Sequence, residues 1–491
     1  MSVNVKKSLL GLRFFASRFL DIFSVLFLIL NFIIWHLNNK ELDISKYRLY
    51  HQGIQLLFAV VLINFDKFNP KKFIKDNLIF ILITILGLYN SLNIVIDFNG
   101  QSVDMGMRSF ELMLEAFPSF ILIIVAYRMA NRRAFVTGLS IVLVLILGYA
   151  LLAIGQDQFN LNTFFGQVIT SSGNRHQSIL NNSNVLGEYA FIGIFISFFL
   201  SFLISPLWLK LVILLPVPIL GHVMVLSGSR TGLFMTASYY AVINLYYKYF
   251  KKTSKMILMI GNLILFFSVI LLIMGYLDFY VDSIRSEISL SGRDTIWFNG
   301  FKIIEQFQFS GIGYNNFTYV YNEWFGVLTS PHNMFIGMTA EFGILALGLT
   351  TVWFGVLFIR NHNQIITNVN SKFTTYLIFF NAFYLTFFIG QMTEYSLLKF
   401  SSINTLFLAL QGLNFQMIEL SKEKKYEPLK LSVLYLVMFG CFYVIVLRGL
   451  NSGAKRYLYS LVFFVLLTGC ISISNGLIKH ITVYKKKKSI N

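Results

Sequence analysis

Three arginines and one histidine stand beside the ends of long apolar runs, where a membrane would meet water: Arg175, Arg230, Arg293 and His332. Arginine stays charged and offers five N–H donors in a planar fork, which suits a diphosphate group. Histidine is the side chain best suited to take a proton near neutral pH. The arginines could instead reach lipid phosphates at the interface, and His332 could make a merely structural hydrogen bond.

Two of these residues belong to the segment from Asp278 to Glu341, the longest one that cannot span a membrane. Apolar residues recur there at three- and four-residue spacing, which predicts a short amphipathic helix from about Arg293 to Phe307. The Gly311-Ile-Gly313 turn should end this helix. We expect an irregular aromatic stretch next, and a membrane span that begins directly after His332.

Aromatic side chains of the same segment could stack on the CH faces of sugar rings. The candidates are Trp297, Tyr314 and Trp324. Trp and Tyr are also enriched where a membrane meets water. Anchoring the segment to the membrane surface is therefore the alternative, and it is slightly favoured for each residue taken singly.

Three carboxylates, Glu188, Glu341 and Glu394, lie within or at the ends of apolar runs. A carboxylate at membrane depth is costly and predicts a functional role, and for Glu341 a structural pairing with an arginine is equally open. The sequence shows no metal-ligand cluster, no phosphate-binding glycine loop and no Ser/His/Asp set. The two cysteines, Cys441 and Cys470, fall in apolar runs and are interpreted as small buried hydrophobes. We therefore expect no metal and no cofactor.

The elements that must position these residues are membrane spans. Of the 491 residues, 56% are hydrophobic and only 13% are charged, against about a quarter charged in soluble domains. A span needs roughly 20 apolar residues, and about 14 such runs can be drawn. Their approximate bounds are 19–36, 47–65, 77–96, 109–127, 134–154, 184–204, 210–227, 231–247, 256–277, 333–359, 373–392, 400–417, 431–448 and 457–477.

The formal net charge of +18 indicates membrane orientation and not nucleic-acid binding. If the N-terminus is cytoplasmic, most of the 40 Lys and Arg residues fall in cytoplasmic segments, as the positive-inside rule requires. Basic ends also favour anionic lipid of the bilayer. The sequence therefore predicts an all-α polytopic membrane protein with both termini cytoplasmic and one long extracytoplasmic loop that contains short helices.

Three regions follow from this layout. Residues 1–155 form N-terminal transmembrane helices, with a retained first span and no removed signal peptide. Residues 156–417 form a core whose extracytoplasmic loop is 278–332. Residues 418–491 form an added C-terminal transmembrane hairpin and a basic tail. We expect the seventh run to be kinked at Pro216 and Pro218, because proline breaks the helical hydrogen-bond ladder.

Four motifs, in order, resemble the O-antigen polymerase and ligase superfamily of the Wzy/WaaL type. Each lies on the predicted outer side, and together they cover about 175–343. They are Arg175 with Asn181, Asn182 and Asn184 running into Leu186-Gly187; Ser229-Arg230-Thr231; Gly292-Arg293 with Trp297 and then Gly311-Ile-Gly313; and His332-Asn333 with Phe342-Gly343. The last two spans depart from the commoner twelve-span family pattern.

This resemblance implies a metal-independent glycosyltransferase on the outer face of a bacterial cytoplasmic membrane. Its donor would be a glycan on undecaprenyl diphosphate. By position in the motifs, His332 would be the base on the acceptor hydroxyl, and Arg230 and Arg293, with Arg175, would bind the diphosphate. Cations must neutralise the charge that develops on such a leaving group. A length-regulating partner is also expected from the family.

The motifs leave polymerase and ligase open, because the two share them. We favour a polymerase of capsular or exported polysaccharide repeat units. The competing class is a lipid-linked oligosaccharide flippase, which can also have about 14 spans. A transporter predicts charges deep in many spans and no long outer loop. This chain has few charges in mid-span and one long outer loop, which favours the transferase.

Overall fold

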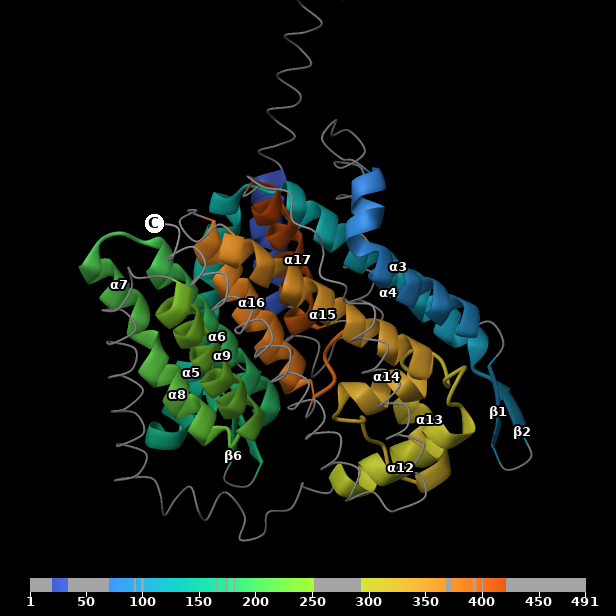
Figure 1. The fold of residues 1–491 in the computed structure, drawn as a ribbon. Helices are drawn as coiled ribbons and strands as arrows, with labels where there is room; N and C mark the ends of the chain where they lie inside the picture. Colours follow the sequence, from blue (N-terminus) through green and yellow to red (C-terminus); the bar gives the residue numbers. More distant parts are fainter. Residues whose placement is uncertain are drawn as a thin grey trace, which may run out of the picture. The chain divides into compact units, whose positions relative to one another are not determined.

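The computed structural model describes residues 20–33, 70–91, 94–98, 101–164, 167–172, 175–180, 182–250, 293–367, 373–391, 394–399 and 401–420. The predicted spans 47–65, 256–277, 431–448 and 457–477 lie outside these ranges, as do the start of the loop 278–332 and nearly all of the C-terminal region 418–491. The described part of the chain is mostly helical (Figure 1). It divides into two compact units.

Unit 1 comprises Met1–Asp76, Leu114–Ile288 and Leu357–Lys422, and unit 2 comprises Asn77–Met113, Ser289–Val356 and Glu423–Asn491. Three long helices contribute residues to both: α3 (Pro70–Ser91), α4 (Gly106–Met129) and α15 (Ile344–Thr367). Unit 1 also holds the helix Leu20–Ile33, α5 (Arg132–Phe159), α6 (Ser183–Leu203), α7 (Leu207–Leu214), α8 (Pro216–Leu226), α9 (Arg230–Phe250), α16 (Thr374–Gly390) and α17 (Ser402–Leu420).

In the described residues, six helices are long and apolar enough to cross a membrane. They are Phe73–Ser91, Ser109–Met129, Arg132–Phe159, Ser183–Leu203, Leu207–Leu226 and Ile344–Thr367. Each overlaps a predicted run, although Ile344–Thr367 covers only the second part of the run 333–359 and extends beyond it. The helix Leu20–Ile33 and α16 are shorter apolar helices at two further predicted runs. The membrane character is thus supported, while the total of about 14 spans and the side of each terminus stay predictions.

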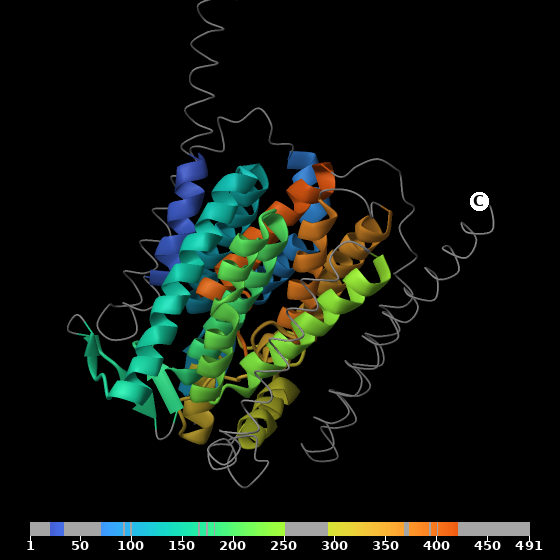
Figure 2. The same cartoon turned by 90° about the vertical axis from the view of Figure 1, so that its left-hand side faces the viewer.

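Helix α6 is the centre of unit 1. It packs against α5, α7, α8 and α9 (Figures 1 and 2), and nearly all of its side chains are buried. Asn182 begins the helix because its side chain accepts hydrogen bonds from the N–H groups of Asn184 and Val185. Gly193 lets α8 come close, since a Cβ there would stand 2.6 Å from Leu220. Phe195 packs on Phe383 of α16, with ring centroids 4.7 Å apart.

The polar stretch after α5 is not only loop. It forms two antiparallel hairpins (teal in Figure 2), one of β3 (Thr163–Phe164) with β4 (Gln167–Val168) and one of β5 (Thr170–Ser172) with β6 (Arg175–Ser178). The fold is therefore mostly helical rather than purely all-α. Pro216 is the first residue of α8 and separates it from α7, as the predicted kink requires.

Unit 2 holds the short helices α12 (Arg293–Gln306), α13 (Phe317–Phe325) and α14 (Met334–Phe342), and the hairpin of β1 (Val95–Phe98) with β2 (Gln101–Asp104). The predicted helix after Arg293 is confirmed. The prediction that the aromatic stretch is irregular is wrong, because Phe317–Phe325 forms α13. Residues 333–359 are also not one continuous helix. The helix is interrupted at Gly343, whose φ of 82° and ψ of 170° are not helical.

Candidate active site

Arg175 joins three parts of unit 1. It lies on β6, and its Nε donates to the carbonyl oxygen of Ser227 at 2.9 Å. Its Nη2 donates to Oδ1 of Asn184, at the start of α6, at 2.7 Å. The guanidinium therefore ties the hairpin to the turn between α8 and α9 and to the first turn of α6. No sequence pattern marks the Ser227 contact, because every residue carries a backbone carbonyl.

The turn that carries Arg230 lies directly against the start of α6. A Cβ added to Gly187 would stand 2.1 Å from Cβ of Ser229, and one added to Gly232 would stand 2.7 Å from the carbonyl oxygen of Gly187. Ser229 is buried, whereas Arg230 is exposed at the first position of α9. Unit 1 thus brings two of the sequence motifs, and with them Arg175 and the turn of Arg230, side by side.

Glu394 takes part in the same polar chain. Nδ2 of Asn184 donates to Oε1 of Glu394 at 3.2 Å, while Oδ1 of the same amide accepts from Arg175. The amide of Asn184 therefore links the guanidinium of Arg175 to the carboxylate of Glu394.

His332 has an unusual backbone in unit 2. Its φ is 45°, in the left-handed region that side chains with a Cβ rarely adopt. The residues on both sides are buried, while His332 itself is half-buried. Asn333 begins α14, because its side chain accepts from the N–H of Phe335 at 2.8 Å and of Ile336 at 3.2 Å. The histidine thus stands at a sharp turn that leads into a helix.

Helix α12 connects Arg293 to this turn. Arg293 is its first residue, and Trp297 follows one helical turn later. The indole Nε1–H of Trp297 donates to the carbonyl oxygen of Pro331, the residue before His332, at 2.9 Å. A Cβ added to Gly300 would stand 2.8 Å from Ile336, so α12 packs tightly on α14. Helix α12, which begins at Arg293, is thus tied through Trp297 to the residue before His332.

The Gly311-Ile-Gly313 turn docks on the C-terminal end of α14. The N–H of Ile312 donates to the carbonyl of Ala340 at 2.7 Å, and that of Gly313 to the carbonyl of Glu341 at 2.9 Å. These contacts satisfy carbonyl groups that a helix end leaves without intrahelical partners. Gly311 has a φ of 68°, and a Cβ there would stand 2.4 Å from the carbonyl oxygen of Glu341. The turn therefore requires glycine.

Glu341 is buried in α14 and is 1% exposed. Its Oε1 accepts from the N–H of Phe317, the first residue of α13, at 3.4 Å. A carboxylate at a helix N-terminus is favoured by the helix dipole and by the unpaired N–H groups there. The structure thus gives Glu341 a contact with a helix N-terminus, while its pairing with an arginine and a role in chemistry both stay predictions.

The three predicted stacking residues differ in burial. Trp297 is 4% exposed and Tyr314 is 3% exposed, and both pack inside unit 2. Their burial argues against contact with a sugar. Trp324 on α13 is half-buried and packs on Phe307 and Phe325. Glycan stacking therefore remains a prediction for Trp324 alone.

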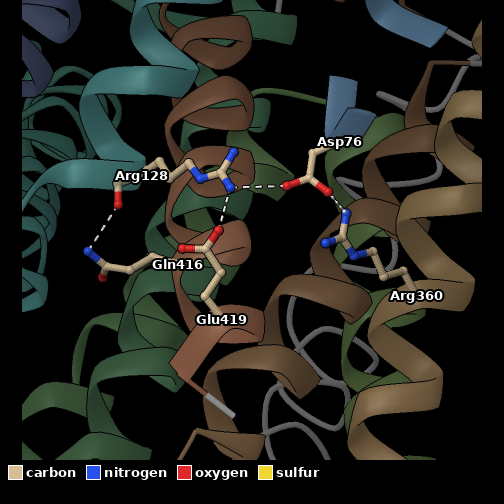
Figure 3. A network of polar contacts seen from close by, with 5 residues as sticks. All are labelled: Asp76, Arg128, Arg360, Gln416 and Glu419. Carbon is tan, nitrogen blue, oxygen red and sulfur yellow. Dashed lines mark hydrogen bonds and ion pairs between the residues drawn. The ribbon is translucent and has the colours of Figure 1, made fainter. Parts of the chain in front are cut away.

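A second polar cluster lies in unit 1, at the C-terminal ends of α4 and α17 (Figure 3). Asp76 accepts from Arg128 at 3.1 Å and from Arg360 at 2.9 Å, and Arg128 also pairs with Glu419. Gln416 donates to the backbone carbonyl of Arg128 at 3.1 Å. Two carboxylates and two guanidinium groups thus join α3, α4, α15 and α17.

Part of this sequence matches the model of a known protein family. Residues 215–351 match the family model described as O-antigen ligase. This segment contains Arg230, Arg293 and His332, and it ends before Glu394. A comparison with curated proteins found no match. The match confirms the resemblance in the motifs: residues 215–351 are similar to the O-antigen ligase family, which supports the O-antigen polymerase and ligase superfamily.

Proposed function

We propose that this protein is a membrane glycosyltransferase that polymerises undecaprenyl-diphosphate-linked oligosaccharide repeat units on the outer face of the bacterial cytoplasmic membrane. The family match and the six candidate spans support a multi-pass membrane enzyme of the O-antigen ligase or polymerase type. The observation that carries the finer proposal is the hydrogen bond from Trp297, one helical turn after Arg293, to the residue before His332, whose backbone is left-handed.

The proposed reaction joins two lipid-linked glycans. His332 takes the proton of an acceptor sugar hydroxyl, and the hydroxyl oxygen forms a bond to the anomeric carbon of the donor. The bond from that carbon to the diphosphate oxygen breaks, and undecaprenyl diphosphate leaves with the electron pair. The histidine then releases its proton to water. The product is a longer glycan on one lipid, and one undecaprenyl diphosphate is set free.

The arginines act on the leaving group in this proposal. Arg293, Arg230 and Arg175 donate to the diphosphate and stabilise the negative charge that grows as the anomeric bond breaks. Two observations support this part of the proposal: Arg175 lies beside the turn of Arg230 in unit 1, and in unit 2 the helix that begins at Arg293 is bonded to the residue before His332.

A ligase is the second candidate, because the matching family model is described as O-antigen ligase. A ligase would use the same donor and the same residues but would transfer the glycan to a different acceptor. We favour the polymerase over the ligase. It would make a capsular or exported polysaccharide, with a chain-length regulator as its partner. The family match speaks against the flippase.

Deletion of the protein in a host that needs it for polymer distinguishes these functions. Loss of a polymerase leaves single lipid-linked repeats on the outer face of the membrane. Loss of a ligase leaves long polymer attached to undecaprenyl diphosphate, and loss of a flippase leaves single repeats on the cytoplasmic side. Mass spectrometry of extracted lipids gives the glycan length, and labelling with an impermeant reagent gives the side.

A further inference from the structure

The left-handed backbone of His332 is held from both sides. A residue with a Cβ pays free energy for such a conformation and keeps it only where its surroundings enforce it. On one side Asn333 is fixed as the start of α14 by two hydrogen bonds. On the other side the ring of Pro331 restricts its own φ. A further restraint on the peptide between Pro331 and His332 comes from Trp297.

That restraint is the hydrogen bond from Nε1 of Trp297 to the carbonyl oxygen of Pro331, 2.9 Å long. The indole is 4% exposed and belongs to a core cluster with Ile336 and Ala340 of α14 and with Val320 of α13. Indole has a single donor, which a buried tryptophan usually satisfies. The ring cannot shift easily in this core, so the carbonyl that it holds cannot shift either.

We infer that Trp297 is a positioning residue, whose indole N–H fixes the peptide before His332 and so aims the imidazole at the acceptor hydroxyl. The inference rests on the proposed function, because it takes His332 as the base. It replaces the expectation that Trp297 stacks on a sugar. Arg293 lies one turn earlier on α12. The same helix therefore positions both His332, through Trp297, and the diphosphate-binding Arg293.

The test removes the donor and keeps the ring. Trp297→Phe retains an apolar aromatic side chain, and benzothienylalanine at position 297 retains the full bicyclic shape with sulfur in place of N–H. The substrate is the lipid-linked repeat extracted from a strain without the protein. Because a misplacement of about 1 Å can lower a rate on the order of a hundredfold, we expect kcat to fall about tenfold to a hundredfold while KM stays within about twofold.

The matched control is Trp353→Phe. Trp353 is also buried in unit 2, where its ring packs on Phe80 and Phe354, and its substitution should leave kcat and KM unchanged. Thermal unfolding in detergent identifies variants that fail to fold. If Trp297→Phe folds poorly, the benzothienylalanine variant decides the question, because its shape matches that of tryptophan.

Two results overturn the inference without touching the proposed function. One is a wild-type kcat for the variants at position 297 while His332→Ala is inactive. The other is a rise in KM with unchanged kcat, which would return Trp297 to substrate binding. Activity in His332→Ala would instead contradict the proposed function itself, so the two failures are distinguishable.

Discussion

Gly343 and Phe309 touch through their backbones. A Cβ added to Gly343 would stand 2.1 Å from the carbonyl oxygen of Phe309, and Gly343 has a φ of 82°. The next N–H, of Ile344, donates to the carbonyl oxygen of Gln308 at 2.9 Å. The chain segment after α12 thus occupies the space in which α14 would continue, and this contact divides the predicted span into α14 and α15.

Gly343→Ala should therefore destabilise the protein. With a ψ of 170° this backbone conformation is essentially restricted to glycine and costs on the order of 1–3 kcal/mol for alanine, and the contact with Phe309 adds to it. We expect a clearly lower melting temperature in detergent and less protein in the membrane. Gly326→Ala is the control for a positive φ without a steric contact, since Gly326 has a φ of 69° and a ψ of 18° with nothing near its Cβ position. Equal melting temperatures for the two variants would contradict the steric account.

Much of the helical scaffold follows from local signals. The bounds of α5 and α6 agree with the predicted runs within a few residues, because apolar length and the capping residues Asn131 and Asn182 are both visible in the sequence. The break at Gly343 could not be predicted, because its cause lies in a segment more than 30 residues earlier. Helix α13 was missed although Phe317, Val320 and Tyr321 show helical spacing.

For the candidate site, residue types are more predictable than contacts. Arg175, Arg230, Arg293 and His332 stand out because a charge or an imidazole beside an apolar run is costly and needs a reason. The partners that position them are backbone carbonyls of Ser227 and Pro331, which no sequence pattern marks. Trp297 was a candidate for sugar stacking or membrane anchoring because an aromatic residue in a polar loop looks exposed until the packing of α12 on α14 is known.

The pairing of Asp76 with two arginines predicts a large effect on stability. Asp76 is 9% exposed and accepts from both Arg128 and Arg360. Removing one partner of a buried ion pair costs roughly 3–5 kcal/mol. Asp76→Asn should lower the melting temperature strongly without a specific effect on KM. Asp157→Asn, which removes a more exposed partner of His176, should cost about 1 kcal/mol or less. Similar losses in both variants would contradict this account.

The amide of Asn184 predicts a rescue experiment. Asn184→Asp keeps the acceptor for Arg175 but places a carboxylate against Glu394, so repulsion should destabilise unit 1. Adding Glu394→Gln supplies an amide that can donate to the new carboxylate. The double variant should therefore regain most of the melting temperature that the single variant loses. Additive losses would show that the two side chains do not interact.

Arg293→Lys tests the diphosphate role. Lysine keeps the positive charge but loses the planar fork, so donation to the diphosphate changes in geometry. We expect a fall in kcat on the order of a hundredfold, as for loss of one transition-state donor. Lys302→Ala, which removes an exposed cation over the ring of Phe298 on the same helix, is the matched control. If both variants lose activity equally, α12 acts through its overall charge.

His332→Ala is the most direct test of the central claim, that this histidine is the base of a glycan polymerase. The measurement is the length distribution of lipid-linked glycan in a host that depends on the protein for its polymer, with equal amounts of variant protein in the membrane. We predict that long polymer disappears and that single undecaprenyl-diphosphate-linked repeats accumulate on the outer face. Long polymer at the wild-type level would contradict the claim.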